Sequence, residues 1–473
     1  MSDIDDIIDA STGPGTCQGK LWGGSAVCDD RARKVDDNVI KAAATTATDT
    51  MPRVDGSWLE SSQHKTWTID QALRLLSFFT ASVDRDGRFV ELDDDGQPLP
   101  LGSPPASAPR QNLLTVTRVV HSYALGEMLG IPGGRAIVDR GLRTLWDEHR
   151  DPVAGGYFEA VGRGGPGDTT KAAYGHAHVL LAAASAVAAG HSDASALFDD
   201  ALMVIDEHFW SEHDGAATIE ACDREWRPLE AYRGANSNMH LCESLLAAAE
   251  VSGRPDLADR AARLAARFIG GQARAHGWLL PEHYDLCWEP MLEYNRDNLD
   301  DPFRPYGATI GHSLEWSRLV ICARIATGRS DDWFVDAAEA MFDRGVSVGW
   351  DREHGGLAYT VDWDGAPANP DHYWWPIAEG IAASSYLERV TADARYEHWY
   401  RTFWEFAASH LIDRERGGWY PELDAHNQRK THPWYGKPDI YHALQACLLP
   451  VLPVASSAVG AIRRQRPVSV RAR

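Results

Sequence analysis

Gly355-Gly356-Leu357-Ala358-Tyr359 is a Gly-headed turn that leads into aromatic and β-prone residues, and it stands between two stretches of helical apolar spacing. The same arrangement recurs five more times, at Asp86-Gly87-Arg88-Phe89, Gly155-Gly156-Tyr157-Phe158, Asp214-Gly215, His276-Gly277-Trp278-Leu279 and Gly417-Gly418-Trp419-Tyr420. The key glycines (87, 156, 215, 277, 356 and 418) are 59 to 79 residues apart. Each interval has room for two helices of about 15 residues with their connections. We therefore expect six helix pairs.

Apolar residues at helical spacing mark the individual helices. We expect helices near 68–82, 112–129, 136–149, 171–190, 194–211, 236–252, 256–272, 308–326, 331–346, 372–388, 394–411 and 439–452. Such pairs can close into an all-α (α/α)6 toroid, with the odd-numbered helices inside and the Gly-led hairpins at one rim. An open solenoid is the alternative, because periodicity does not reveal closure. Either arrangement is one domain.

Composition and charge exclude several classes of protein. The 473 residues can bury a sizeable core, and 46 Lys and Arg against 68 Asp and Glu give a net charge of -22. This charge disfavours nucleic acid or a membrane surface as a partner. The seven cysteines are scattered without a Cys-x-x-Cys pair, which argues against a zinc ribbon or a disulfide framework. The acidic N-terminus lacks the basic start of a signal peptide, so we expect a cytoplasmic protein.

The two ends of the chain differ from its middle. Residues 1–60 are rich in Asp, Gly, Ser and Thr and lack apolar periodicity, so they are expected to form a disordered extension. Residues 61–453 are expected to form the helical barrel that carries the functional site. Residues 454–473 end in a basic, irregular segment and are expected to be a flexible tail.

Aromatic and histidine side chains are unusually abundant, with 18 Trp, 15 Tyr and 19 His. Sugar-binding clefts use such groups, because ring faces stack on C–H bonds while polar tips reach hydroxyls. Most individual aromatic residues are nevertheless expected to be ordinary core packing.

Polar residues that interrupt the apolar helices indicate where the chemistry lies, since a buried charge or imidazole needs partners. His240 and Glu243 share a helix face, as do His312 and Glu315. In a closed toroid such residues would meet in one pocket, where carboxylates could tune the imidazoles to titrate near neutrality. No His-Glu-x-x-His pattern accompanies them, so we assign no metal. The candidates are Arg118, Tyr174, Asn236, His240, Glu243, His312, Glu315, Trp375, Glu379 and His442.

Seven strings, in order along the chain, carry a resemblance to a known family. They are Thr-Arg-Val-Val-His-Ser-Tyr (117–123), Lys171 with Tyr-Gly-His-Ala-His (174–178), Tyr-Arg-Gly-Ala-Asn-Ser-Asn-Met-His (232–240), Gly-His-Ser-Leu-Glu-Trp (311–316), Tyr-Thr-Val-Asp-Trp (359–363), Trp-Pro-Ile-Ala-Glu (375–379) and Gly-Lys-Pro-Asp-Ile-Tyr-His (436–442). From about residue 51 to 453 the chain resembles the N-acylglucosamine 2-epimerase superfamily, whose members are cofactor-independent sugar isomerases and epimerases on (α/α)6 barrels.

The resemblance implies a small monosaccharide as substrate, no cofactor, and a monomer or homodimer. It places the two catalytic histidines at His312 and His442, and the other eight candidates around the sugar. Disaccharide 2-epimerases similar to this chain carry Trp five residues before the last catalytic His, where Lys437 stands here, so cellobiose is not expected. Sulfosugar isomerases would need Arg or Gln donors, but Pro302, Pro421 and Pro438 offer none.

The strings are most similar to the branch that isomerises D-mannose. They imply conversion of D-mannose to D-fructose through a cis-enediolate, with His442 moving the proton from C2 to C1. His312, held by Glu315, would move protons on the oxygens, while Arg118 and His240 stabilise charge on O1 and O2.

Other functions are open at this stage. Within the family these are a sulfoquinovose isomerase, for which Arg304 or Lys437 could bind the anion, and a sugar 2-epimerase. An (α/α)6 glycoside hydrolase would use Glu315 and Glu379 as its two carboxylates. A carbohydrate-binding module without catalysis would keep the aromatic residues and tolerate loss of His442.

Overall fold

The computed structural model describes residues 44, 50–99 and 111–465. Residues 1–43 and 45–49 of the expected extension, and residues 466–473 of the expected tail, lie outside the described residues.

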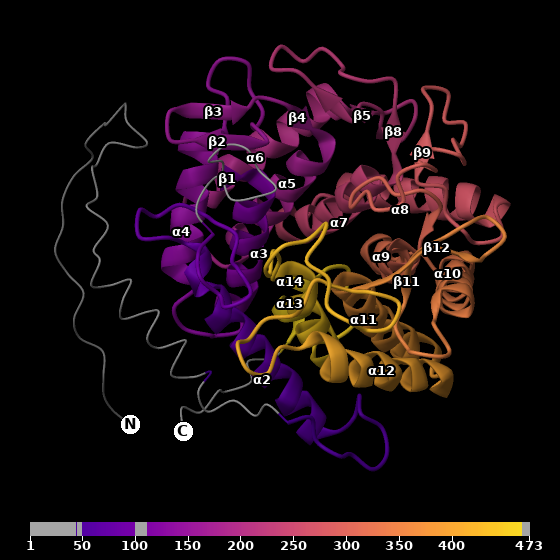
Figure 1. The fold of residues 1–473 in the computed structure, drawn as a ribbon. Coiled ribbons are helices and arrows are strands. Elements are labelled where there is room, and N and C mark those ends of the chain that lie inside the picture. The colour runs from indigo at the N-terminus through magenta and orange to yellow at the C-terminus, as the bar shows by residue number, and fades with distance from the viewer. Residues whose placement is uncertain (1–43, 45–49, 100–110, 466–473) are drawn as a thin grey trace, which may run out of the picture.

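Six helices form a closed inner ring (Figure 1). They are α3 (Leu113–Met128), α5 (Ala173–Ala188), α7 (Ala235–Ser252), α9 (Ile310–Thr327), α11 (Trp374–Thr391) and α13 (Tyr441–Leu448). Each packs against the next, and α13 packs against α3. The chain is therefore a mostly helical (α/α)6 barrel, as the sequence predicted, and not an open solenoid.

Six further helices cover the ring from outside: α2 (Ser62–Phe79), α4 (Arg135–Thr144), α6 (Ala194–Val204), α8 (Pro255–Ala265), α10 (Trp333–Gly349) and α12 (Ala394–Phe406). Because α2 packs against α13, the first of these twelve helices is the outer partner of the last. Counted along the chain from α2, the inner helices are therefore the second, fourth, sixth, eighth, tenth and twelfth of the twelve. Our assignment of the odd-numbered helices to the inside was wrong.

Several helices end in turns of a different winding. α4, α6, α8 and α12 continue into π-helical turns, which are η2 (Leu145–His149), η3 (Ile205–Phe209), η4 (Ala266–Ala273) and η5 (Ala407–Leu411). Two short 3₁₀ helices, η1 (Thr80–Ser82) and η6 (Leu449–Val451), follow α2 and α13. With these turns included, the twelve segments predicted from apolar spacing correspond to the twelve barrel helices.

Short antiparallel strands join the helices at one rim. One sheet contains β1 (Gln111–Asn112), β2 (Ala160–Gly162) and β3 (Gly165–Asp168), and another contains β10 (Ala308–Thr309), β11 (Ala358–Val361), β12 (Pro367–Tyr373) and β13 (Glu422–Leu423). Three two-stranded ladders pair β4 (Lys171–Ala172) with β7 (Ala221–Cys222), β5 (Trp210–Ser211) with β6 (Ala216–Ala217), and β8 (Arg233–Gly234) with β9 (His283–Tyr284). Since β1, β4, β8, β10 and β12 run directly into inner helices, those helices begin at the strand rim.

The glycines of the six recurring turns have the backbone geometry that their positions require. Gly87, Gly156, Gly215, Gly277, Gly356 and Gly418 all have positive φ, a region that glycine enters without a steric penalty. At position 156 a side chain would also collide with Trp226, because a Cβ atom added to Gly156 would lie 2.7 Å from the Trp226 ring.

Both predicted ends of the barrel domain were placed too far inward. Trp58 and Leu59 are buried in the core, and the Trp58 amide donates a hydrogen bond to Glu397 on α12. At the other end, α14 (Ala458–Arg464) packs against α3 and α7. Its buried residues Val459 and Ile462 cover apolar surface, which is why this basic segment is folded.

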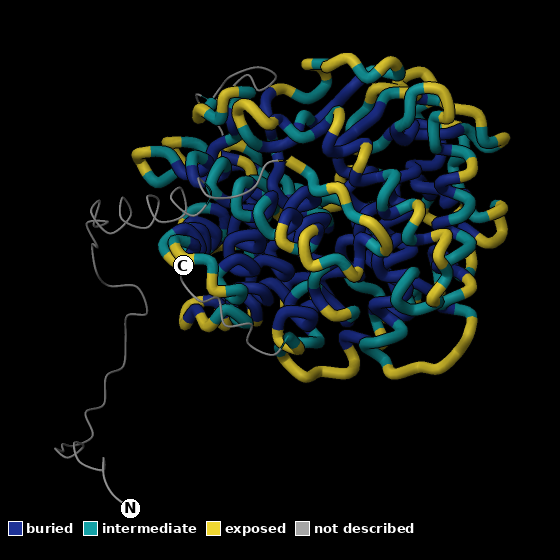
Figure 2. The backbone as a smooth tube through the Cα atoms, turned by 90° about the horizontal axis from the view of Figure 1, so that it is seen from below, coloured by how far each residue is buried: buried dark blue, intermediate teal, exposed yellow. Residues whose placement is uncertain are grey.

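The α14 segment lies at one end of the barrel. Ser456 and Arg463 donate hydrogen bonds to Glu250, near the C-terminal end of α7, so α14 lies at the end opposite the strands. The inner helices are buried almost throughout, and exposed residues lie in the loops and on the outer helices (Figure 2). Among the described residues, no helix combines the length and apolar character needed to cross a bilayer.

Candidate active site

The predicted site residues lie near the N-terminal ends of the inner helices, at the strand rim. Tyr174, Asn236, Trp375 and His442 are the second residues of α5, α7, α11 and α13, and His312 is the third residue of α9. One turn deeper, Arg118, His240, Glu315 and Glu379 are the sixth residues of α3, α7, α9 and α11. Because the inner helices share one axis and one direction, equivalent positions converge at one end of the barrel.

A single pocket brings eight of the ten predicted residues together. Its wall contains Arg118, Tyr174, Asn236, His240, His312, Glu315, Trp375 and His442, together with Pro302, Phe303, Tyr359, Trp374 and Trp434. The remaining two, Glu243 and Glu379, are buried behind the wall, where they contact residues that line it.

His442 is oriented by a buried carboxylate. Its Nδ1 lies 2.8 Å from Glu379 Oε1, and Glu379 Oε2 accepts a hydrogen bond of 3.0 Å from Arg318. A carboxylate that accepts the Nδ1 proton favours the tautomer in which Nε2 carries a lone pair. His442 can therefore serve as a base at the pocket wall.

His312 has a similar partner, but not the expected one. Its Nδ1 lies 3.0 Å from Oε1 of Glu282, which precedes β9. Glu315 stands one turn deeper on α9, and neither of its carboxylate oxygens has a hydrogen-bond partner among the described residues. The expectation that Glu315 holds His312 was wrong, because spacing of three residues gives a shared helix face without giving a hydrogen bond.

His240 is a neutral imidazole at physiological pH. Burial lowers the pKa of His240 to about 4, and Glu243, whose Oε2 lies 3.7 Å from Nδ1, offsets only part of this effect. The expectation that carboxylates bring the imidazoles near neutrality therefore fails at this position. His240 can still donate one hydrogen bond to a substrate oxygen.

Arg118 supplies a fixed positive charge to the wall. Its guanidinium donates a hydrogen bond of 2.8 Å to the Tyr174 hydroxyl and lies 3.4 Å from Asp439 Oδ2. Burial raises the pKa of Tyr174 to about 12, so its phenol stays protonated. The Arg118 side chain is thus held in place before any ligand arrives.

Trp375 stands between the two histidines predicted to be catalytic. Its ring centroid is 5.0 Å from that of His312 and 5.7 Å from that of His442. A sugar that contacts both imidazoles must therefore also contact the indole, which is the kind of apolar surface that sugar C–H groups prefer.

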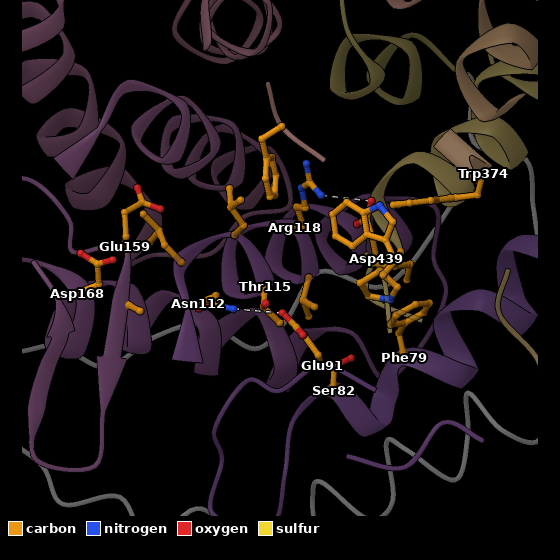
Figure 3. A pocket seen from close by; sticks show the side chains of 18 residues that line it. Phe79, Ser82, Glu91, Asn112, Thr115, Arg118, Glu159, Asp168, Trp374 and Asp439 are labelled. Carbon is orange, nitrogen blue, oxygen red and sulfur yellow. Dashed lines mark hydrogen bonds and ion pairs between the residues drawn. The ribbon is translucent and has the colours of Figure 1, made fainter. Parts of the chain in front are cut away.

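A larger cavity of about 390 Å³ adjoins this pocket and shares Arg118, Phe303, Trp374 and Trp434 with it (Figure 3). Glu159 and Asp168 lie together on one side, and Arg118 lies between them and Asp439. Burial, with a contribution from Asp168, raises the pKa of Glu159 to about 8. The walls also include Glu91, so four carboxyl groups, those of Glu91, Glu159, Asp168 and Asp439, line this cavity.

Two basic residues near the pocket are already paired elsewhere. Both terminal nitrogens of Arg304 donate to Glu230 at 2.7 Å, and Lys437 Nζ donates to Asp413 at 2.7 Å. Neither residue lines either cavity, whereas Pro302 and Pro438 do. Pro421 lines neither of them.

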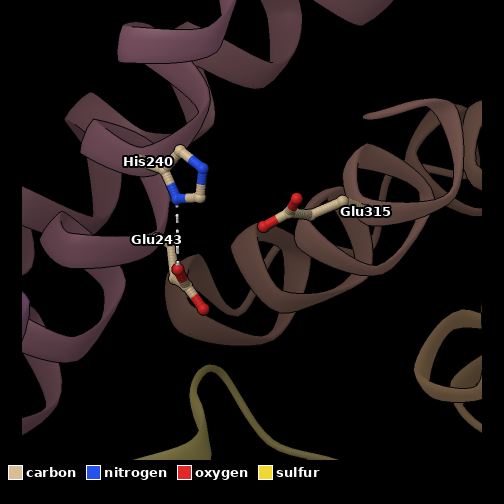
Figure 4. A group of neighbouring side chains, drawn as sticks. All are labelled: His240, Glu243 and Glu315. Atoms are coloured by element: carbon tan, nitrogen blue, oxygen red, sulfur yellow. Dashed lines mark ion pairs between the residues drawn. The ribbon is translucent and has the colours of Figure 1, made fainter. Parts of the chain in front are cut away.

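Two groups of side chains have a geometry compatible with a metal ion. They are His240, Glu243 and Glu315, shown in Figure 4, and Glu315, Glu379 and His442; in each group the ligand atoms lie within 4.8 Å of one another. Arg318, however, places its guanidinium 3.0 Å from Glu379 and 3.8 Å from Glu243 and Glu315. This cation already supplies positive charge among the three carboxyl groups.

Sequence reasoning missed four residues close to this site: Glu282, Arg318, His178 and Tyr441. Arg318 continues the spacing of His312 and Glu315 along α9, so the same pattern would have revealed it. His178, whose ring lies 4.7 Å from that of His240, and Tyr441, which donates a hydrogen bond to Glu243, stood inside strings that we had already noted. Glu282 lies outside the helices, and no periodic signal marks it.

Comparisons with known proteins identify the family of this chain. The model of the N-acylglucosamine 2-epimerase (GlcNAc 2-epimerase) family matches residues 87–446. D-mannose isomerase from Thermobifida fusca is 42% identical over 410 residues, which cover 86% of this chain and 98% of that protein. D-mannose isomerase from Pseudomonas cannabina pv. alisalensis is also 42% identical, over 86% of this chain and 97% of its own. A crystal structure of D-mannose isomerase superposes with a TM-score of 0.75 at 29% identity, covering 82% of this chain and 97% of that one.

Proposed function

Because the chain belongs to the N-acylglucosamine 2-epimerase family and is a sugar isomerase or epimerase, we propose that it interconverts D-mannose and D-fructose. One arrangement carries this proposal. His312 and His442 each have a carboxylate on Nδ1, and both line a pocket in which Trp375 stands between them.

His442 performs the carbon chemistry in this proposal. With Nδ1 bonded to Glu379, its Nε2 removes the C2 proton of the open-chain aldose and returns it to C1 of the cis-enediolate. One base is enough, because both carbons present the same face of the planar intermediate. The reaction is internally balanced, so no redox cofactor takes part.

The remaining groups of the pocket transfer protons to and from the sugar oxygens and stabilise charge on them. His312, oriented by Glu282, moves protons on the ring oxygen and the carbonyl oxygen. Arg118 and the neutral His240 donate hydrogen bonds to O1 and O2, where negative charge develops in the transition state. Tyr174 fixes Arg118 for this task.

A glycoside hydrolase fits the site less well. That reaction needs two carboxyl groups beside the scissile bond. Glu315 faces the pocket, but both oxygens of Glu379 are engaged, one by His442 and one by Arg318. Glu379 is therefore unsuited to act as nucleophile or base.

The test is product analysis by NMR in D2O, with mannose, fructose, glucose and sulfoquinovose offered separately. We expect fructose from mannose and mannose from fructose. Glucose as the first product from mannose would identify a 2-epimerase instead. Release of monosaccharides from an oligosaccharide, without isomerisation, would identify a hydrolase.

A further inference from the structure

Arg318 is a buried cation that the reaction scheme has not used. It lies on α9, is 2% exposed, and sits among three glutamates of the inner ring. Its NH2 group is 3.0 Å from Glu379 on α11, 3.8 Å from Glu243 on α7, and 3.8 Å from Glu315 on α9. One positive charge therefore faces three acids, and it cannot neutralise all of them.

We propose that Arg318 is a positioning residue for the isomerisation proposed above: it keeps Glu379 an anion, so that Glu379 holds His442 with Nε2 free to act as the base. The same placement leaves Glu315 as the acid that retains its proton and offers a hydrogen-bond donor to the pocket.

The contacts of Glu379 support the first part. Arg318 donates to Oε2 and His442 Nδ1 faces Oε1, so both oxygens are used. Burial opposes ionisation of Glu379, but Arg318 and the His442 hydrogen bond together lower its pKa below the ordinary value. Without the guanidinium, Glu379 would protonate and could donate its own proton to Nδ1. The imidazole proton would then move to Nε2, and the base would be lost.

The surroundings of Glu315 support the second part. Burial and the neighbouring carboxylates of Glu379 and Glu243 raise the pKa of Glu315 well above its ordinary value. Its two oxygens have no hydrogen-bond partner among the described residues, although the residue lines the pocket. Other charged or titratable groups face this cluster from the inner helices and their ends. They are Arg118, His121, Tyr174, His240, Cys242, Cys322, Tyr386, Asp439, Tyr441 and His442.

A positioning role differs from a structural role in its dependence on pH. We would measure kcat and KM for mannose from about pH 5 to 9 in Arg318→Met and Arg318→Gln, which remove the charge, and in Arg318→Lys, which keeps it. Both neutral variants should lose about 10–100-fold in kcat at neutral pH, with a smaller change in KM. The acid limb of the profile of kcat against pH should move to higher pH by about one unit or more, because Glu379 then needs a higher pH to ionise.

Two further variants complete the comparison. Arg318→Lys should restore most of the activity and the wild-type acid limb. Arg324→Met, in the last turn of the same helix and outside both cavities, should keep the wild-type profile. A neutral variant of Arg318 that folds and keeps the wild-type profile would overturn the proposal. So would an equal loss at every pH that Lys does not restore, since that pattern indicates a structural role.

Spectroscopy of the wild-type protein tests the arrangement even when the neutral variants do not fold. The ¹⁵N NMR signal of His442 can be assigned by its loss in His442→Ala. At neutral pH we expect this signal to be that of the Nδ1-protonated tautomer. Infrared spectra should contain a protonated carboxylic acid band that disappears in Glu315→Gln. An Nε2-protonated His442, or no such band, would overturn the proposal. These readouts do not depend on mannose being the substrate, so a failure of the proposed function is separately visible.

Discussion

The indole of Trp375 occupies the space that a side chain on Gly311 would need. A Cβ atom added to Gly311 would lie 2.1 Å from Trp375 Cζ3, far inside van der Waals contact. The missing side chain thus lets α11 place Trp375 beside α9, between His312 and His442. The glycine next to His312 is needed for the shape of the pocket.

We therefore predict that Gly311→Ala lowers kcat/KM for mannose by about 100-fold, because a displacement of about 1 Å at catalytic groups can cost that much. Gly345→Ala on α10 is the matched control, since its Cβ would meet Ser313 at 3.4 Å and nothing closer. It should keep full activity and add some stability. Equal kinetics for the two variants would show that Trp375 has room to move.

His442→Ala tests the assignment of the base. A positioned general base contributes roughly 10²–10⁴-fold, so turnover of mannose should fall by that factor while circular dichroism shows an intact fold. Retention of more than about a tenth of wild-type turnover would remove His442 from this role.

The sequence was sufficient for the helices and for the (α/α)6 class, but not for which helices form the inner ring. Apolar periodicity is a local signal, and it located every barrel helix. The pairing of α2 with α13 joins residues at opposite ends of the chain, and no local pattern reports it. The same holds for α14, whose basic sequence resembles a tail until its contacts with α3 and α7 are known.

The site shows the same division between local and distant information. Polar residues that interrupt inner helices, such as His312 and Glu315, could be predicted from the sequence, because a polar group on a buried apolar face is costly unless it has a partner. The partner of His312 was not visible, because Glu282 lies in an irregular segment 30 residues away. Only the fold brings that carboxylate to the imidazole.

Removal of metal ions should leave the activity unchanged. Arg318 already provides positive charge among Glu243, Glu315 and Glu379, so the proposed reaction needs no cation there. We expect the kcat of exhaustively EDTA-dialysed protein to match that of untreated protein. A loss that Mn²⁺ or Co²⁺ restores would show that one of the two histidine and glutamate groups binds a metal.

His191 should make stability depend on pH. Burial alone would lower its pKa, but hydrogen bonds of 2.6 Å to Asp139 and 2.9 Å to Glu127 raise it above the ordinary value. A raised folded-state pKa contributes stability that is fully present below the unfolded-state value of about 6.5 and is lost as pH rises through the folded-state pKa.

His191→Gln should accordingly lower the Tm more at pH 6 than at pH 9. The control is His213→Gln, because the His213 side chain is 97% exposed. This substitution should change the Tm little at either pH. A Tm loss for His191→Gln that is the same at pH 6 and pH 9 would contradict the assignment of a charged His191.

Substrate choice depends on what could hold an anion. A sulfonate buried in this pocket would need charge-assisted donors, and truncation of such a donor typically costs about 2–5 kcal/mol. Arg304 and Lys437 are engaged by Glu230 and Asp413, and the adjoining cavity is lined by carboxyl groups. We therefore predict that kcat/KM for mannose exceeds that for sulfoquinovose by at least about 100-fold. Side-by-side kinetics decide the matter. A preference for sulfoquinovose that disappears in Arg304→Gln would show that Arg304 leaves Glu230 to bind the anion, and that the choice of mannose is wrong.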